Sequence, residues 1–240
     1  MVSFVIPVYN VASPRADAWL NHAVASIYLQ EYKGDIEIIL ADDGSIDSTK
    51  NSLKNISHKF NAPHRKIKLL YLPHGGIAKT LNAAIKASTG QFIFRLDADD
   101  FCDKMRVVKQ LEKFDDPKVG LVTSYARIVR DDEITMEIWW TLDSHESLFK
   151  EFIHNNPICH PAVAIRREVF STVGYYDESL LYAQDYQFWY RISKQFRIAV
   201  VSEALTYYRL SSMRVTSRNF SQQLSCSKQI KKWILSQETT

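Results

Sequence analysis

Hydrophobic residues in the first hundred positions form short continuous runs, separated by stretches with helical spacing. The runs predict four buried strands, over residues 2–8, 36–41, 67–72 and 91–96. The stretches between them repeat apolar residues every three or four positions, which predicts helices. Strand and helix therefore alternate four times, as is typical of a parallel sheet with helices on both faces.

Polar residues just before the helical stretches predict where the helices begin. Asp17 precedes the first apolar-periodic stretch, and we expect its side chain to cap that helix. Ser45 or Asp47 can cap the second helix in the same way. The Gly75-Gly76 pair is expected to open the third helix.

The second half of the chain is less regular, and its apolar spacing predicts shorter elements. Helices are expected over residues 105–114, 148–153, 185–192 and 220–235, and strands over residues 120–129, 162–165, 198–201 and 205–208. No Gly/Ser-rich linker, low-complexity tract or internal repeat divides the chain. We therefore expect a single α/β domain over residues 1–240, with a mostly parallel central sheet.

Composition and charge narrow the class of protein. The chain has 240 residues, 46% of them hydrophobic, which is enough for one substantial core. A formal net charge of +3 is too small to indicate a nucleic acid partner. No apolar run approaches the roughly 20 residues of a membrane span. Cys102, Cys159 and Cys226 show neither CxxC nor zinc spacing and suit a reducing compartment, so we expect a cytoplasmic protein.

The C-terminal region is locally basic. It contains one acid, Glu238, and six basic residues, Arg209, Arg214, Arg218, Lys228, Lys231 and Lys232. An ordinary solvated face explains this pattern, and so does a surface for phosphates or for peripheral contact with the inner face of an anionic membrane.

Polar clusters follow three of the predicted strands: Tyr9-Asn10, Asp42-Asp43 and Asp97-Ala98-Asp99-Asp100. In open parallel sheets, ligands bind beyond the carboxyl ends of the strands. We therefore expect the three clusters on one rim, facing one crevice.

The carboxylates of this rim suggest a metal site. Asp97 and Asp99 lie two positions apart and can converge on one ion, and paired carboxylate oxygens suit Mg²⁺ or Mn²⁺ together with phosphate oxygens. The alternative is a loop of Asx turns and helix caps. Arg95 and Lys79 are nearby cations that would touch a diphosphate or neutralise the acids.

Asp185 stands directly before a predicted aromatic helix, in Gln184-Asp185-Tyr186-Gln187-Phe188-Trp189. Judged by its neighbours alone, Asp185 is a helix N-cap, because Asp is a preferred capping residue. Trp189 is expected in the core.

Several stretches together resemble the family 2 inverting glycosyltransferases, which have the GT-A fold. The matching stretches run in family order: Phe4-Val5-Ile6-Pro7-Val8-Tyr9-Asn10, Ile38-Ile39-Leu40-Ala41-Asp42-Asp43-Gly44-Ser45, Gly75-Gly76-Ile77-Ala78-Lys79-Thr80-Leu81-Asn82, Arg95-Leu96-Asp97-Ala98-Asp99-Asp100, His160-Pro161-Ala162-Val163 and Gln184-Asp185-Tyr186-Gln187-Phe188-Trp189. Each is weak alone, but the set in this order is specific.

The resemblance implies a nucleotide-binding half over residues 1–100, an acceptor-binding half over residues 101–205 and a C-terminal tail or helix over residues 206–240. Pro7, Val8 and Tyr9 would line the base and ribose site. Asp43, together with Asp42, would accept the ring N–H of uracil.

In the same resemblance, Lys79 lies near the nucleotide, and Asp97 and Ala98 belong to the donor site, with Asp97 toward the ribose. Asp99 would be the main metal ligand, with Asp97 beside it, and Asp100 would be structural. Asp185 would be the general base that deprotonates the acceptor hydroxyl, while Mn²⁺ or Mg²⁺ stabilises the departing diphosphate.

The chain departs from the family pattern at two places. Gln184 stands where the family usually has Glu, which removes a like charge beside Asp185. After Tyr208-Arg209, Leu210-Ser211 stands where the family often has a His; that function would be absent or moved to Arg214 or Arg218. The Gln-x-x-Arg-Trp signature of processive synthases is missing, which favours addition of a single sugar.

The expected activity is transfer from a UDP-hexose or UDP-N-acetylhexosamine to a saccharide hydroxyl, with inversion, in cell-surface polysaccharide or lipid-linked glycan assembly. One alternative is a non-catalytic nucleotide-sugar-binding protein of the same fold. Another is a response-regulator receiver, which the length and the second half fit badly. His160 fits either contact with acceptor or phosphate, or a hydrogen-bonded, half-buried histidine.

Overall fold

The computed structural model describes residues 1–130, 132–139, 141–210 and 220–238. The described strands are β1 (Val2–Val8), β2 (Ile36–Asp42), β3 (Arg65–Tyr71), β4 (Phe92–Arg95), β5 (Phe101–Cys102), β6 (Val119–Arg130), β7 (Glu133–Trp139), β8 (Ala164–Arg166) and β9 (Arg197–Leu210). The described helices are α1 (Pro14–Tyr28), α2 (Thr49–Phe60), α3 (Ile77–Ala87), α4 (Arg106–Glu112), α5 (His145–Glu151), α6 (Arg167–Thr172), α7 (Gln184–Ser193) and α9 (Phe220–Glu238), with 3₁₀ turns η1 (Lys113–Asp115) and η2 (His160–Ala162).

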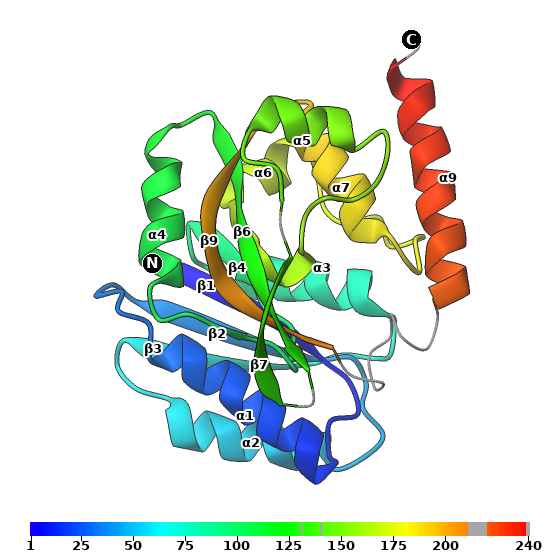
Figure 1. Ribbon diagram of the computed structural model, residues 1–240. Coiled ribbons are helices and arrows are strands. Elements are labelled where there is room, and N and C mark those ends of the chain that lie inside the picture. The colour runs from blue at the N-terminus through cyan, green and yellow to red at the C-terminus, as the bar shows by residue number, and fades with distance from the viewer. Residues whose placement is uncertain (131, 140, 211–219, 239–240) are drawn as a thin grey trace.

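All of these strands join one sheet, in the order β3-β2-β1-β4-β8-β6-β9-β5, and β7 pairs with β6 (Figure 1). The four strands of the first half, β3-β2-β1-β4, are parallel throughout. Strand β8 then pairs antiparallel with both β4 and β6, which joins the second half to the first. Strands β6 and β9 are again parallel to each other, whereas β5 and β7 are antiparallel additions. The predicted α/β class is confirmed, and every antiparallel pair includes a strand of the second half.

Helices cover both faces of the sheet, because successive side chains of a strand point to opposite faces. On one face Phe4 and Ile38 pack against α1 and α2. On the other face Val5 and Ile39 pack with α3, and the same core continues to α7 and to Ile234 of α9. Trp189 is fully buried in it, as predicted. Figure 1 shows α1 and α2 below the sheet, and α3, α5, α6 and α7 above it.

The predicted helix starts are partly wrong. Ser13, not Asp17, caps α1, since its hydroxyl accepts the Ala16 N–H at 3.2 Å and Asp17 already lies in the first turn. Asp47 accepts the Thr49 N–H at 3.0 Å at the start of α2, although Ser48 takes the cap position. The helices therefore begin near the predicted positions, but the capping residue is Ser13 in place of Asp17 and Ser48 in place of Ser45 or Asp47.

Two predicted strands over residues 198–201 and 205–208 are one long strand, β9. The register against β6 shifts between Val201 and Ala204, so the two residues between them bulge out of an otherwise continuous ladder. Their polar side chains explain why the apolar pattern breaks there. Strands β5 and β7 and helix α6 were not expected, because they are short or half-exposed. No described helix is both long and apolar enough to span a membrane.

Candidate active site

The strand order brings the carboxyl ends of β2, β1 and β4 side by side, as predicted. The acidic side chains that follow these strands nevertheless lie in different surroundings. Asp42 is fully buried beneath the rim, where its Oδ1 accepts the Ser45 N–H at 3.1 Å. Its Oδ2 makes no hydrogen bond within the described part of the chain. Asp42 is therefore a buried support of the turn after β2.

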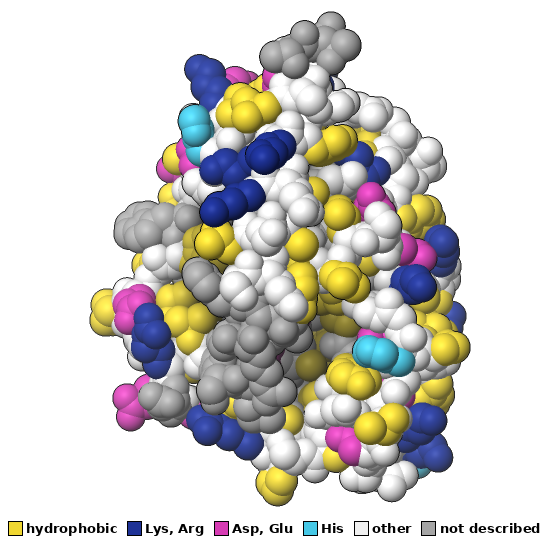
Figure 2. Space-filling view, turned by 90° about the vertical axis from the view of Figure 1, so that its right-hand side faces the viewer, with side chains coloured by type: hydrophobic (Ala, Val, Ile, Leu, Met, Phe, Trp, Pro, Cys, Tyr) yellow, Lys and Arg dark blue, Asp and Glu magenta, His cyan; other side chains and the backbone are white. Residues whose placement is uncertain are grey.

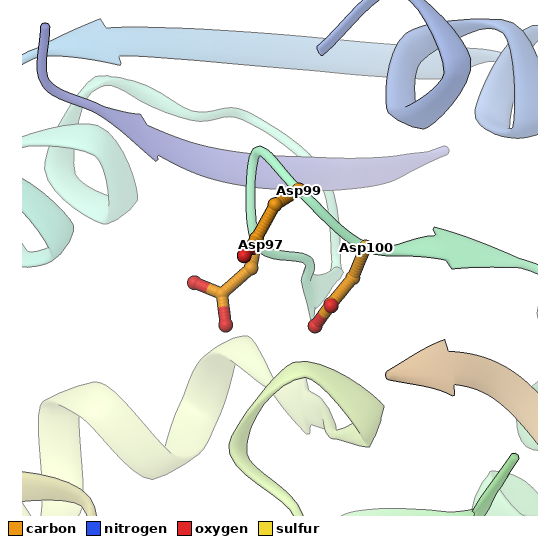
Figure 3. A group of neighbouring side chains, drawn as sticks. All are labelled: Asp97, Asp99 and Asp100. Carbon is orange, nitrogen blue, oxygen red and sulfur yellow. The ribbon is translucent and has the colours of Figure 1, made fainter. Parts of the chain in front are cut away.

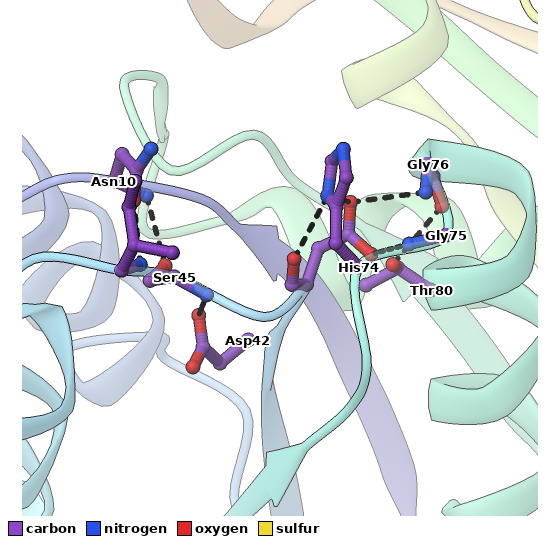
Figure 4. A network of polar contacts seen from close by, with 9 residues as sticks. Asn10, Asp42, Ser45, His74, Gly75, Gly76 and Thr80 are labelled. Atoms are coloured by element: carbon purple, nitrogen blue, oxygen red, sulfur yellow. Dashed lines mark hydrogen bonds and ion pairs between the residues drawn. The ribbon is translucent and has the colours of Figure 1, made fainter.

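Asp43 is held at the start of α3. Its Oδ1 accepts the Gly75 N–H at 2.8 Å, and its Oδ2 accepts the Gly76 N–H at 3.1 Å. Gly76 has φ +87°, a conformation that side-chain-bearing residues rarely adopt. Nδ1 of His74 lies 2.9 Å from Oδ2 of Asp43, and the His74 ring stacks on Tyr9 with centroids 4.6 Å apart. Figure 4 shows this network, with the second ring nitrogen of His74 turned away from it.

Asp97, Asp99 and Asp100 form the acidic cluster, in the loop after β4 (Figure 3). Each offers a carboxylate oxygen, and these oxygens all lie within 4.8 Å of one another. Asp97 and Asp99 are partly exposed and Asp100 is buried. Hard oxygen ligands at this spacing suit Mg²⁺ or Mn²⁺, and a cation would relieve the mutual repulsion of three carboxylates. The residues present therefore fit the metal that their spacing in the sequence suggests, with Asp100 as an additional member.

A buried cation stands behind the acidic cluster. The Arg95 side chain is 3% exposed, and its Nη2 lies 2.5 Å from Oδ1 of Asp97. Its Nε and Nη1 have no hydrogen-bond partner in the described residues. A buried guanidinium with one carboxylate partner keeps a strong field in its surroundings, because little water screens it.

Asp185 lies in the first turn of α7, but it is not the cap, so that interpretation is wrong. The cap position belongs to Ala183, whose φ of +58° is left-handed. The Asp185 carboxylate is partly exposed and accepts the Asn156 amide N–H at 2.9 Å. Burial raises the pKa of Asp185, and the Tyr186 backbone N–H, the Arg95 charge and the Asn156 amide oppose part of that rise. The result is a carboxylate more basic than an ordinary Asp.

His160 is a half-buried, hydrogen-bonded histidine, which matches the second of its two interpretations. Its Nε2 lies 3.1 Å from the Tyr176 hydroxyl. Burial, followed by the Arg95 charge, holds the pKa of His160 well below its usual range. The imidazole is therefore neutral at physiological pH. A contact with acceptor or phosphate stays a prediction.

The remaining predicted residues lie around the same end of the sheet. Pro7 and Ala98 are partly exposed, Val8 is buried, and Tyr9 is 44% exposed. Lys79 is exposed on the first turn of α3, directly after the Gly75-Gly76 pair. Arg214 and Arg218, the proposed replacements for the family His, lie outside the described residues.

Three contacts of the site could not be expected from the sequence. They involve Asn156 beside Asp185, His74 beside Asp43, and the Arg209–Asp132 pair beside the acidic cluster. Each joins residues at least 29 positions apart. Among these residues, only Arg209 belonged to a sequence motif, the Tyr208-Arg209 pair.

Comparison with known proteins identifies the family. A family model described as Glycosyl transferase family 2 matches residues 3–174. The amylovoran biosynthesis glycosyltransferase AmsE of Erwinia amylovora is 29% identical over 224 residues, which cover 91% of this chain and 79% of AmsE.

Two solved structures share the architecture. S. aureus TarS 1–349 in complex with UDP-GlcNAc superposes with a TM-score of 0.68 at 19% identity, over 90% of this chain and 60% of that chain. The mannosyltransferase PcManGT from Pyrobaculum calidifontis, in complex with GDP-Man and Mn²⁺, has a TM-score of 0.70 at 17% identity, over 94% of this chain and 62% of that chain. At such identities the likeness shows the fold alone, and it confirms the predicted GT-A fold. The chain is a glycosyltransferase and belongs to glycosyl transferase family 2, as its motifs predicted.

Proposed function

We propose that the protein transfers one sugar from a nucleoside-diphosphate sugar to a hydroxyl of a saccharide acceptor, with inversion at the anomeric carbon. The observation that carries the proposal is that carboxylates in two different environments adjoin one buried cation. Arg95 pairs with Asp97 of the acidic cluster, and its charge also acts on Asp185 at the start of α7. Different environments give the same side chain different roles, here a metal ligand and a base.

The proposed donor is a UDP-sugar, either a UDP-hexose or a UDP-N-acetylhexosamine. Tyr9 offers an exposed ring for stacking the base, next to Pro7 and Val8. Asp43 is the proposed acceptor for the uracil ring N–H. His74 now covers one face of Tyr9 and one oxygen of Asp43, so the base would displace this ring or share its partners. TarS was solved with UDP-GlcNAc and PcManGT with GDP-Man, so proteins of this fold accept different bases.

The metal is proposed to be Mn²⁺ or Mg²⁺, held by Asp99 and Asp97, with Asp100 able to contribute an oxygen. When bound, such a cation supplies positive charge to the oxygens of the departing diphosphate. Lys79, on the exposed first turn of α3, is proposed to add a second positive charge near the nucleotide. Arg95 limits the charge of the cluster and holds the Asp97 carboxylate toward β4.

Asp185 is the proposed general base. Its raised pKa makes it a better proton acceptor than an ordinary Asp. It takes the proton of the acceptor hydroxyl as the oxygen forms its bond to the anomeric carbon. The bond from that carbon to the diphosphate oxygen breaks on the opposite side, so an α-linked donor gives a β-linked product. The Asn156 amide orients the carboxylate for this step.

Assembly of a surface polysaccharide or a lipid-linked glycan is the proposed setting, and AmsE supports it by its name. The α9 helix supports peripheral contact with an anionic membrane. Lys228 and Lys232 are exposed on it and Lys231 is partly exposed, and Figure 2 shows basic side chains gathered on the face that carries α9. Each such lysine contributes about 1 kcal/mol to the free energy of binding to an anionic membrane surface. Co-sedimentation with phosphatidylserine vesicles tests this contact, and equal binding of neutral vesicles would refute it.

A thermal-shift screen of UDP-, GDP-, dTDP- and CMP-sugars, with and without Mn²⁺, tests the donor. A ligand that binds only the folded protein raises its melting temperature by mass action, so the correct donor class gives the largest shift. We expect a UDP-sugar with Mn²⁺. A larger shift with another base would overturn the role of Asp43, and donor binding without transfer to any saccharide acceptor would favour the non-catalytic alternative.

A further inference from the structure

Arg209, the next-to-last residue of β9, lies directly behind the acidic cluster. It is 3% exposed. Its backbone N–H donates to Oδ1 of Asp100 at 2.8 Å, and its side-chain Nε–H donates to the carbonyl oxygen of Asp99 at 2.8 Å. One residue therefore fixes two consecutive residues of the cluster, from a strand more than a hundred positions later. In Figure 3 Asp100 points toward the end of that strand.

The Arg209 side chain is held in turn by the hairpin between β6 and β7. Asp132, in the turn, forms an ion pair with Nη1 of Arg209. The same carboxylate accepts the indole N–H of Trp19 at 2.7 Å and an Arg15 N–H at 2.9 Å, both from α1. The guanidinium also lies 4.9 Å from the centroid of the Trp19 ring and 5.7 Å from that of Phe101. Its position is thus set from β9, α1, β5 and the hairpin together.

We propose that Arg209 and Asp132 are positioning residues of the metal site, and that the β6–β7 hairpin thereby sets the affinity of the acidic cluster for its cation. The inference rests on the proposed function, because it takes the cluster as the metal site. With Asp132 in place, the guanidinium is paired on its far side, and its Nε–H donates to a backbone carbonyl of the cluster. The Asp99 and Asp100 carboxylates then keep one geometry.

Without the Asp132 charge, a buried guanidinium is left beside three carboxylates. It would turn toward them as the nearest counter-charges, because an unpaired buried charge is costly. The carboxylates would then be partly neutralised by the protein, and a divalent cation would have to displace Arg209 to bind. Residues that orient metal ligands from behind typically change metal affinity by about 10- to 100-fold.

The experiment measures the dissociation constant of Mn²⁺ on the full chain without donor, by electron paramagnetic resonance of the free ion. Asp132→Asn keeps the size of the side chain and its tolerance of the left-handed turn, where φ is +68°. We expect its Mn²⁺ affinity to fall about 10-fold or more. Arg209→Lys keeps the charge but cannot bridge the Asp99 carbonyl and Asp132 together, so we expect a similar loss.

The matched control is Glu137→Gln, which breaks the exposed 2.7 Å pair with Arg130 in the same hairpin. It should leave Mn²⁺ affinity unchanged. Melting temperatures measured in chelator separate loss of folding from loss of binding, and a variant is compared only where it is folded.

Unchanged Mn²⁺ affinity in folded Asp132→Asn would overturn the coupling and leave the metal site intact. If the wild-type chain itself bound no Mn²⁺, the metal site of the proposed function would fall, and the coupling with it. In the double variant, losses that simply add would also overturn the pairing, since residues that act together through one contact are not additive.

Discussion

The acidic cluster after β4 and the single carboxylate of Asp185 are two regions built from the same side chain in opposite surroundings. The cluster gathers three carboxylates, with Arg95 paired to one of them and Arg209 bonded to two of the three residues. Asp185 has a neutral amide as its side-chain partner, and burial dominates its pKa. Carboxylates gathered at one place repel one another and favour a bound cation, whereas burial with a neutral partner favours a basic carboxylate. We propose that this difference separates a metal-binding site from a proton acceptor.

The largest effect is expected for Asp99→Ala. Removing one of the three carboxylates should abolish Mn²⁺-stimulated transfer, because the two that remain, one of them paired with Arg95, hold a divalent cation poorly. The rate of sugar transfer with and without chelator checks this. Wild-type activity that is the same in chelator would contradict the metal site itself.

Asp185→Asn should lower kcat by about 10²- to 10⁴-fold, the usual contribution of a general base. Donor binding should be nearly unchanged, and a thermal shift with the donor checks that. The variant should also be no less stable than the wild type at pH 7. A carboxyl whose pKa is raised by folding contributes stability only at low pH and loses it as pH rises through that pKa, so removing its charge favours the folded state. A normally active variant would remove Asp185 as the base.

Arg95→Met tests whether the buried cation serves both regions. It should lower kcat/KM by about 10- to 100-fold, because Asp97 loses its ion pair with Arg95 and residues that orient metal ligands typically have effects of that size. It should also move the acidic limb of the pH profile to higher pH, because the Arg95 charge opposes the raised pKa of Asp185. If the rate fell but the acidic limb did not move, Arg95 would affect the acidic cluster and not Asp185.

Asn156→Ala is expected to have the smallest effect. The amide lowers the pKa of Asp185, so its removal should raise that pKa and shift the acidic limb upward. Because the Asp185 carboxylate itself remains in place, we expect less than about a tenfold loss of kcat. Activity measured from acidic to neutral pH checks the direction, and a shift to lower pH would show that the amide favours the protonated form.

Much of the first half was predictable from the sequence, because its elements are local and regular. Strands β1 to β4 and helices α1 to α3 follow apolar periodicity, and their order places Asp43 and Asp97 at one end of the sheet. The second half depends on long-range pairing, and periodicity missed β5, β7 and α6. The bulge in β9 made one strand look like two.

The candidate site also has features that the sequence predicted and features that it did not. Motifs and spacing alone were enough to predict the acidic cluster, the parallel half-sheet, and Asp185 as the candidate base by resemblance. Only the tertiary structure decided that Asp42 is buried and that the Arg95 charge influences Asp185 as well as Asp97. It also decided that Asp132 and Asn156 contact Arg209 and Asp185 from distant segments. The physical reason is that residue types and periods are local properties of a chain. Burial, counter-charges and the direction of a pKa shift depend on which distant segments the fold brings into contact.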